Sequence, residues 1–274
     1  VDLVLTAILA NGHVLIEGVP GVAKTLLARL TARLIDADFS RIQFTPDLMP
    51  SDVLGTTVFN MKTNGFDFHQ GPIFADIVLV DEINRAPAKT QAALFEVMEE
   101  RQVSIDGTTH RMGELYTILA TQNPVEQEGT YKLPEAQLDR FLMKITMDYP
   151  SLEEEVNILE RHHTNAALVK LEDVTPVLTK EELLSLRALM SRVFVDRTLL
   201  QYIALIVQQT RTSKAVYLGA SPRASVAMLQ SSKAYALLQG RDFVTPEDIK
   251  FVAPYVLQHL SLIHISEPTR LRRI

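Results

Sequence analysis

Short apolar runs alternate with helical patterns along the chain as far as Pro150. Runs typical of strands occupy 13–18, 39–45, 77–81, 116–121 and 141–147. Apolar residues recur at helical spacing in 2–10, 18–35 and 87–101. Strands that alternate with helices predict a parallel α/β sheet. The 77–81 run is apolar up to its final acid, which predicts a strand buried on both faces.

Two segments between these elements predict β-hairpins. Residues 58–61 and 65–69 flank an Asn64-Gly65 turn, inside an otherwise irregular stretch at 46–74. Residues 102–111 turn at Asp106-Gly107.

After Pro150 the pattern predicts helices only. Three helix starts carry capping pairs, which are Ser151 with Glu154, Thr179 with Glu182 and Thr245 with Asp248. We therefore expect an α/β core at 1–149 and a smaller all-α domain at 150–260, with no internal repeat.

Composition narrows the class of protein. The chain has 274 residues, of which 47% are hydrophobic, so it can bury a substantial core. Its net charge of −6 gives no general attraction to nucleic acid or to an anionic membrane. No apolar run is long enough to insert into a membrane, and no signal peptide is visible. The absence of cysteine excludes thiol chemistry and fits a reducing compartment, so we expect a cytoplasmic protein.

The segment 18–25, GVPGVAKT, predicts a phosphate-binding loop between a strand and a helix. Glycines let backbone N–H groups form a concave nest for phosphate oxygens, and the helix N-terminus favours the same anion. Lys24 would reach the β- and γ-phosphates of a nucleotide, and Thr25 would offer its hydroxyl to Mg²⁺. Ala23 replaces a usual glycine, and we expect it to have the negative φ of a helix start. An ordinary Gly/Pro turn is the alternative.

Two acids follow the buried strand, where ligands bind in open α/β sheets. Asp81 is expected to hold Mg²⁺ through water, and Glu82 to polarise a water that attacks the γ-phosphate. Asn123 follows the next strand and could orient that water, although Asn-Pro turns are also common.

Three arginines are candidates for contacts with phosphate. Arg140, just before the fifth strand, could reach the γ-phosphate of a neighbouring subunit, or it could form an ion pair with Asp139 or a nearby acid. Arg223 lies in the first turn of a helix, where a cation opposes the dipole, which suggests a role with phosphate rather than a solvated surface position. Arg85 is a weaker intersubunit candidate. The pair 162–163, two histidines, has no partner at metal-ligand spacing.

The chain resembles the MoxR-type ATPases of the AAA+ superfamily from Val1 to about His259. The strings that carry the resemblance are GVPGVAKT (18–25), IVLVDEINRAPAKTQAALFEVMEE (77–100), ATQNP (120–124), LPEAQLDRFLM (133–143) and GASPRA (219–224). The resemblance implies a five-stranded parallel AAA+ P-loop core with a helical lid. It also implies a homo-oligomeric ring, expected to be a hexamer, that uses ATP and Mg²⁺.

Residue roles follow from the same resemblance. It implies that Lys24, Glu82, Asn123 and Arg140 act in catalysis, with Asn123 as sensor 1 and Arg140 as the arginine finger. It implies that the nucleotide is bound by Gly18, Val19, Pro20, Gly21, Val22, Ala23, Lys24, Thr25, Leu26, Asp81 and, as sensor 2, Arg223. Residues 55–74 and 102–111 resemble the helix-2 insert and the hairpin before sensor 1. Whether Arg223 acts on its own or on a neighbour's nucleotide stays open.

The implied activity is ATP-driven remodelling, or metal-cofactor loading, of client proteins, with a von Willebrand A-domain protein as partner. Two alternatives remain. One is a nucleic-acid translocase like the MCM helicases, which would need basic residues on the 102–111 hairpin. The other is a scaffold that binds nucleotide only to assemble.

The two ends of the chain depart from the family pattern. The chain opens within a helix, so we expect a missing upstream segment that helps to enclose adenine. Residues 261–274 resemble translated adapter sequence rather than lid, and we expect them to lie outside the fold.

Overall fold

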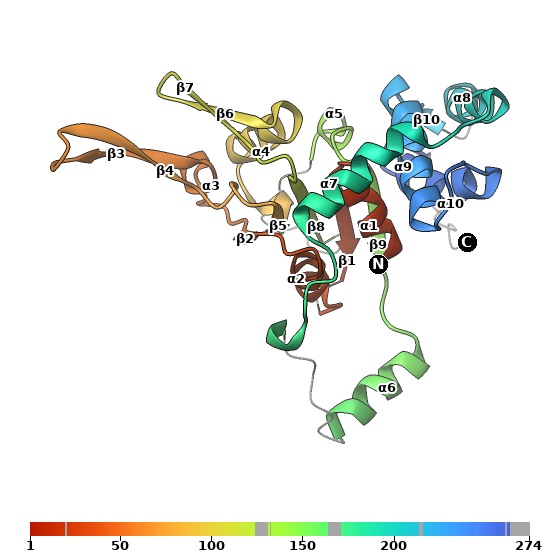
Figure 1. The fold of residues 1–274 in the computed structure, drawn as a ribbon, viewed down its shortest axis with the longest axis horizontal. Coiled ribbons are helices and arrows are strands. Elements are labelled where there is room, and N and C mark those ends of the chain that lie inside the picture. Colours follow the sequence, from red (N-terminus) through yellow and green to blue (C-terminus); the bar gives the residue numbers. More distant parts are fainter. Residues whose placement is uncertain are drawn as a thin grey trace, which may run out of the picture.

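The computed structural model has a parallel α/β core followed by a helical region (Figure 1). It describes residues 1–19, 21–123, 131, 133–163, 171–213, 216–260 and 262–263. The strands of the core sheet are β1 (Val14–Gly18), β2 (Phe39–Gln43), β5 (Ile77–Asp81), β8 (Thr117–Gln122) and β9 (Met143–Met147). All pair in parallel, in the order β2-β5-β8-β1-β9. The predicted five-stranded core is confirmed.

Helices cover both faces of this sheet. The core helices are α1 (Asp2–Leu9), α2 (Lys24–Leu34), α3 (Pro50–Leu54), α4 (Ala88–Glu100) and α5 (Glu135–Leu138). Successive side chains of a strand point to opposite faces. Val14 and Ile16 therefore pack in the cluster that contains α1 and α2, while Leu15 packs with α3 and α4. Every residue of β5 is buried, as its apolar run predicts.

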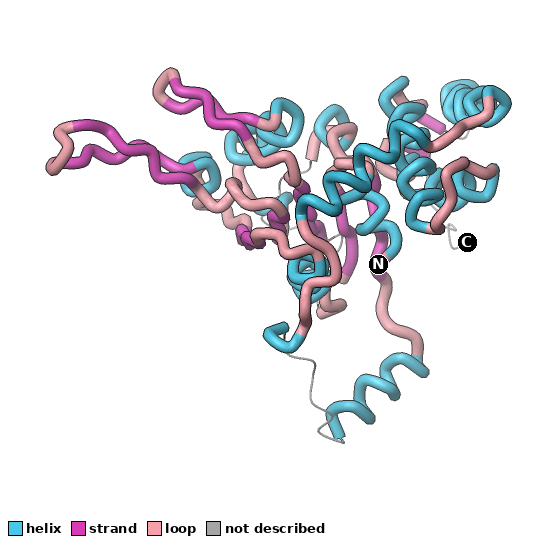
Figure 2. Tube along the Cα trace, viewed as in Figure 1, coloured by secondary structure: helices cyan, strands magenta, loops and turns pink. Residues whose placement is uncertain are grey.

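Two antiparallel hairpins project from the same side of the core (Figures 1 and 2). One consists of β3 (Gly55–Asn60) and β4 (Gly65–Gln70), and the other of β6 (Gln102–Ile105) and β7 (Thr108–Arg111). Asp106 and Gly107 both have positive φ, 49° and 78°, which is the backbone of a type I′ turn. Both predicted hairpins are confirmed.

The remaining helices are α6 (Leu152–His163), α7 (Lys180–Leu189), α8 (Arg197–Thr212), α9 (Pro222–Leu238) and α10 (Pro246–Leu257). Short 3-10 turns lie at Ile83–Arg85, Leu171–Asp173 and Met190–Arg192. All three predicted capping pairs form, with the backbone N–H of the first residue bonded to the acid at 2.7–2.8 Å. Among the described residues, no helix is long and apolar enough to cross a membrane.

The expectation of helices only after Pro150 is wrong. Strands β10 (Val216–Leu218) and β11 (Leu262–Ile263) form a small antiparallel ladder. Such short strands are missed because two or three residues do not establish a period. Leu262 and Ile263 belong to the segment 261–274 that we expected outside the fold, and the rest of that segment lies outside the described residues.

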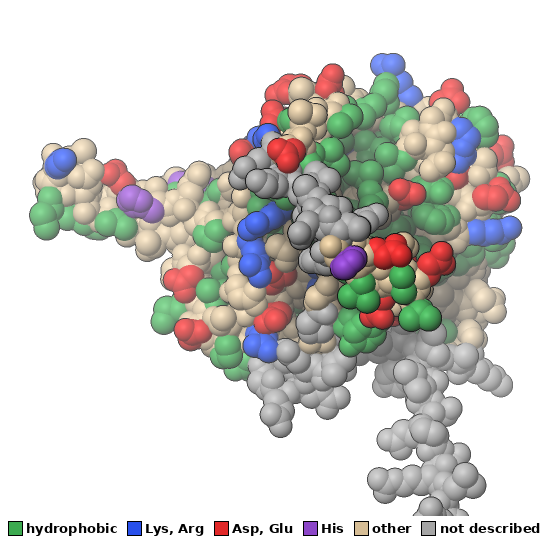
Figure 3. Space-filling view, turned by 90° about the horizontal axis from the view of Figure 1, so that it is seen from below, with side chains coloured by type: hydrophobic (Ala, Val, Ile, Leu, Met, Phe, Trp, Pro, Cys, Tyr) green, Lys and Arg blue, Asp and Glu red, His purple; other side chains and the backbone are tan. Residues whose placement is uncertain are grey.

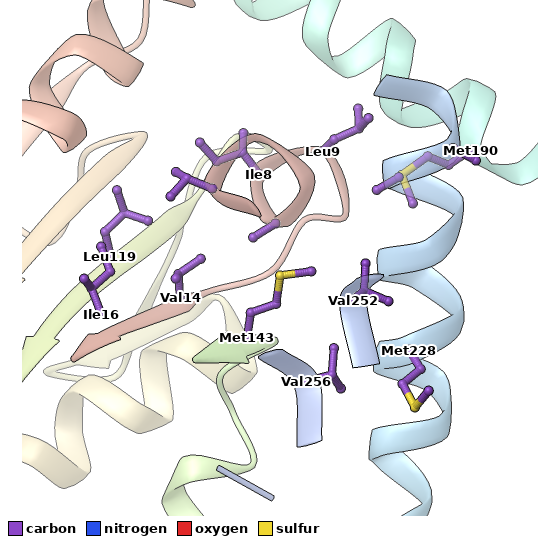
Figure 4. Packing of buried hydrophobic residues seen from close by; sticks show 14 of the residues in the cluster. Ile8, Leu9, Val14, Ile16, Leu119, Met143, Met190, Met228, Val252 and Val256 are labelled. Carbon is purple, nitrogen blue, oxygen red and sulfur yellow. The ribbon is translucent and has the colours of Figure 1, made fainter. Parts of the chain in front are cut away.

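The helical region packs on the core through one continuous apolar cluster (Figure 4). Met228 of α9 and Val252 of α10 belong to the same buried cluster as Ile8 of α1 and Met143 of β9. Arg187 of α7 adds a polar tie, because its guanidinium donates to the Ile8 carbonyl at 2.6 and 3.0 Å. That carbonyl is at the C-terminal end of α1, where a cation is favoured.

Helix α6 contrasts with this arrangement, since it lies apart from the rest of the chain (Figure 1). All residues from Ser151 to Glu160 are exposed, including Leu152 and Leu159. The view from below shows hydrophobic side chains gathered with acidic ones on the exposed surface (Figure 3).

Candidate nucleotide-binding site

The turn between β1 and α2 has the backbone of an anion-binding nest. Gly21 has φ 87° and Ala23 has φ 58° and ψ 26°, both left-handed, and α2 begins at Lys24. Alternation of left- and right-handed residues turns backbone N–H groups into a concavity, and the positive end of the helix dipole adds to it. Pro20, one of the predicted ligand-binding residues, lies outside the described residues. The described part of the loop therefore fits phosphate oxygens of a nucleotide.

Our expectation of a negative φ at Ala23 is wrong. The residue precedes the first helical residue and is left-handed instead of helical. The nest requires this conformation, which costs an L-residue about 1–2 kcal/mol more than a right-handed one. The usual glycine avoids that cost, so alanine leaves the loop strained but present.

Glycine is required for a different reason at Gly18. This residue ends β1 directly beside β9, and a Cβ placed there would lie 2.5 Å from the Met147 carbonyl oxygen. Val19 and Val22 are the remaining described residues of the turn, and Thr25 and Leu26 follow Lys24 in the first turn of α2. The sequence thus places its predicted phosphate-binding residues on one continuous turn.

Lys24 folds back over this loop. Its Nζ donates to the Gly18 carbonyl at 2.7 Å. Burial lowers the pKa of Lys24, and the charges of Asp81 and Glu82 act in the opposite direction. The two acids therefore lie near enough to act on the lysine, at the edge of the sheet where β1 and β5 both end. This is the juxtaposition on which the sequence interpretation depends.

Asp81 is a buried carboxylate with two polar partners. Thr121 of β8 donates its hydroxyl to Oδ1 at 3.1 Å. Arg41 of β2 donates Nε to Oδ2 at 2.6 Å, so the guanidinium neutralises the acid. The sequence analysis assigned no role to either partner. Both lie on strands that flank β5, and that strand order could not be read from the sequence.

Glu82 is held at the strand end by several contacts. Its φ of 56° is left-handed, and its N–H donates to the Thr121 hydroxyl at 3.0 Å. The carboxylate accepts from Gln43 of β2 at 2.9 Å and pairs with Arg85 at 3.0 Å. Arg85, expected as a weak intersubunit candidate, is thus engaged within its own chain. Gln43 is a further site residue that the sequence analysis missed.

Asn123 is buried and directly follows β8, which lies between β5 and β1. It therefore belongs to the same edge of the sheet as the acids and the phosphate loop.

The donor set at this edge fits a hard divalent cation that shares its ligands with a nucleotide. Thr25 supplies a hydroxyl and Asp81 a carboxylate, which are ligands that Mg²⁺ accepts. Within the described part of the chain there is no cluster of three or more His, Cys, Asp or Glu side chains that could hold a metal. Mg²⁺ commonly binds with one or two carboxylates plus phosphate oxygens, so this sparse set is sufficient.

Arg140 and Arg223 lie at the opposite edge of the sheet. Arg140 precedes β9. Leu142, two residues further on, donates its backbone N–H to the backbone carbonyl of His13, which lies just before β1. The strands rise about 3.3 Å per residue, so five-residue β1 separates the two edges by about 13 Å. The structure therefore does not bring either arginine to the phosphate loop of its own chain.

Glu99, near the end of α4, binds both of these arginines. Its carboxylate lies 2.9 Å from Arg140 and 2.7 Å from Arg223. The hydrogen bond from Arg223 lowers the pKa of Glu99, and the bond to Glu99 raises the pKa of Arg223. A cavity of about 490 Å³ adjoins them, lined in part by Met98 and Val226. The ion pair that we weighed for Arg140 exists, with Glu99 as the acid.

The fold and the edge described above define a P-loop nucleotide hydrolase. Residues 13–143 match the profile of the ATPase family associated with various cellular activities, and residues 208–268 match an AAA lid domain. A solved structure from Cytophaga hutchinsonii, itself assigned to the ATPases only provisionally, has a TM-score of 0.87 at 41% identity. That similarity covers 96% of this chain and 82% of the other.

Named relatives narrow the family. The chain is 50% identical to the uncharacterized protein YeaC of Bacillus subtilis, over 96% of this chain and 81% of the relative. It is 46% identical to chaperone MoxR1 of Mycobacterium tuberculosis, over 94% and 70%, and 31% identical to protein MoxR of Methylorubrum extorquens, over 94% and 81%. The chain belongs to the MoxR family of AAA ATPases. Membership implies ATP binding and hydrolysis.

Proposed function

We propose that the chain is one subunit of a ring-forming, Mg²⁺-dependent ATPase whose active site is completed by a neighbouring subunit. The observation that carries this proposal is that the predicted site residues of one chain fall into two separate groups. Lys24, Asp81 and Glu82 meet at one edge of the sheet, while Arg140 and Arg223 meet at the other. A head-to-tail contact between copies would bring the two edges together and would generate a ring if the rotation closes.

In the proposed reaction, water attacks the γ-phosphorus and the bond to the β-phosphate oxygen breaks. Lys24 exchanges its bond to the Gly18 carbonyl for phosphate oxygens. Glu82 accepts a proton from the attacking water, and Asn123 orients that water. Mg²⁺, held by Thr25 and through water by Asp81, would neutralise charge on the phosphates. The neighbour's Arg140 and Arg223 would stabilise the charge on the transferred group.

Strand β2 supplies a polar partner for each of the two acids. Arg41 neutralises Asp81 and Gln43 holds Glu82. Cation binding at Asp81 would displace Arg41, because both compete for the same carboxylate.

We propose protein clients as the object of this ATPase, by remodelling or by metal-cofactor loading. Support comes from the Mycobacterium tuberculosis relative, which is named a chaperone. A hexameric ring and a von Willebrand A-domain partner remain part of the proposal. The translocase alternative gains nothing from the 102–111 hairpin, whose two charged residues, Asp106 and Arg111, cancel.

Steady-state ATP turnover tests the proposal. We expect Glu82→Gln and Arg140→Ala each to reduce turnover by about a hundredfold or more, because each removes a group acting on the transition state. Glu96→Gln, on the exposed side of α4, is the matched control and should retain wild-type turnover. Wild-type turnover in both site variants would contradict the proposal. Normal assembly of the wild type without phosphate release would favour the scaffold alternative.

A further inference from the structure

The two projecting hairpins turn apolar faces toward each other. Cross-strand partners share a face of a hairpin, and so do alternate residues along a strand. On the β3–β4 hairpin, one face therefore carries Thr57, Phe59, Phe66 and Phe68. On the β6–β7 hairpin, one face carries Val103, Ile105, Thr108 and His110. Members of both sets line the same space, so these are the inner faces.

The inner faces meet only near the core. Phe68 and His110 stack across the gap, with ring centroids 4.1 Å apart and planes tilted by 30°. Phe74 packs edge-on against both rings, at 5.8 and 6.4 Å. These three rings join the bases of the hairpins and fix the hairpins' relative position.

Beyond this junction the hairpins diverge toward their tips (Figures 1 and 2). The space between them is a cavity of about 610 Å³, which we call the inter-hairpin cleft. Thr57, Phe66 and Phe68 line it from one side, and Ile105, Asp106, Thr108 and His110 from the other, so that Asp106 is the one acid among the described residues that line it. Phe66 is 73% exposed although it belongs to an inner face. The volume lies within the range of about 300–1,000 Å³ typical of ligand sites.

The charge of the hairpins indicates what the cleft would bind. In 55–70 the charges are Lys62 and Asp67, and in 102–111 they are Asp106 and Arg111, so each hairpin is neutral. Binding of nucleic acid relies on cationic side chains for most of its affinity, and these hairpins supply no excess. Charged side chains are correspondingly sparse on the hairpin that extends from the body in the view from below (Figure 3).

The backbone of the hairpins favours a polypeptide as the ligand. Each hairpin is a two-stranded sheet in the described part of the chain, so each strand keeps one edge free of ladder partners. Free strand edges bind extended polypeptide by adding a strand, while pockets between side chains accept alternate residues. Exposed apolar residues continue to the tip of the longer hairpin, where Met61 is 88% exposed.

We propose that the inter-hairpin cleft binds apolar side chains of an extended client polypeptide. The inference rests on the proposed function in that it takes the remodelled object to be a protein. It goes further by assigning the contact to a site formed by both hairpins, with Phe66 as the exposed aromatic contact.

Fluorescence anisotropy with two labelled twelve-residue peptides tests this assignment. One peptide alternates Phe and Leu with Ser, and the other has Ser at every Phe and Leu position. The wild-type protein should bind the apolar peptide and not the all-Ser peptide. Phe66→Ser should weaken binding by about fivefold or more, as expected for loss of an aromatic contact. Phe194→Ser is the matched control, since Phe194 is 64% exposed but lies in the helical region.

Three results would overturn the assignment. They are equal binding of both peptides, wild-type affinity in Phe66→Ser, and displacement of the apolar peptide by single-stranded DNA at physiological salt. Light scattering that shows a change of assembly in Phe66→Ser, without a change in peptide affinity, would identify a second copy as the occupant instead. A wild type that hydrolyses ATP but binds no peptide would refute this inference alone. Peptide binding without ATP turnover would refute the proposed function alone.

Discussion

Ala23 has a left-handed backbone at the entrance to α2, a conformation that alanine adopts at a cost. Ala23→Gly should therefore raise the free energy of unfolding by about 0.5–1 kcal/mol, after allowance for the greater entropy of unfolded glycine. Urea denaturation measures this change. Ala92→Gly, at an exposed interior position of α4, is the control and should lower stability by about 1 kcal/mol. A loss of stability in both variants would show that Ala23 is unstrained.

His13 makes stability depend on pH. Burial, with help from the charges of Arg101 and Arg187, lowers the pKa of His13 to about 3. The ring accepts from the Ile118 N–H at 3.0 Å, so the other nitrogen, 3.2 Å from the Met98 carbonyl, carries the proton. The unfolded state binds a second proton below about pH 6.5, and the folded state does not until about pH 3. The contribution of His13 to the free energy of unfolding is thus present in full above pH 6.5 and is lost as the pH falls below that value.

Between pH 7 and pH 5, this linkage costs the wild type about 2 kcal/mol. His13→Gln can keep both hydrogen bonds without titrating, so its free energy of unfolding should fall by about that much less over the same interval. The measurement is urea denaturation at the two pH values. His69→Gln, at an exposed hairpin position, should behave as the wild type. An unchanged slope in His13→Gln would refute the assignment.

At the residue scale, the sequence predicts which side chains lie close together better than it predicts backbone conformation. Lys24 is predicted by the spacing of the phosphate-loop motif, and Asp81 and Glu82 by their position after the buried strand. The structure brings the three together. The left-handed φ of Ala23 and of Glu82 could not be predicted, because neither residue type prefers it. The contacts of Arg41 and Gln43 depend on which strand lies beside β5, and periodicity does not reveal strand order.

Among the elements, α4 connects the two edges of the sheet. It begins after Glu82 and ends near Glu99, the residue that holds Arg140 and Arg223. Glu99→Gln removes the charge without changing helix propensity. If Glu99 binds the two arginines where a neighbour's phosphate would otherwise bind, Glu99→Gln should need about threefold less ATP than the wild type for half-maximal turnover.

Glu100→Gln, the adjacent exposed acid, is the control for this prediction. The pairs with Glu99 are partly exposed, with 59% of the Arg223 side chain accessible, so loss of the charge should cost less than about 1 kcal/mol of stability. A higher ATP requirement in Glu99→Gln would mean that Glu99 positions the arginines rather than occupying them.

Element type was largely predictable from periodicity and turn chemistry. The five core strands, both hairpins and the capped helix starts follow from local patterns. The ladder of β10 and β11 does not, because its strands are too short to show a period. The isolation of α6 also could not be predicted, since an amphipathic pattern predicts a helix but does not identify its partner.

For the whole molecule, the arrangement of the edges matters more than any single contact. The lid shares a buried cluster with α1 and β9 (Figure 4). Arg223 and Arg140 lie close together at one edge, where both bind Glu99. The phosphate loop and the acids lie at the other edge. Under the proposed function, a subunit built in this way would carry one half of an active site at each edge of its sheet.

Mixing two inactive variants tests this claim most directly. Glu82→Gln keeps an intact Arg140, and Arg140→Ala keeps an intact Glu82. If the site forms between subunits, about a quarter of the interfaces in an equal, randomly exchanged mixture contain both intact residues. The account predicts that ATP turnover, negligible in each variant alone, returns in the mixture to a substantial fraction of the wild-type rate. A mixture no more active than its separate components, with exchange of subunits verified, would contradict it.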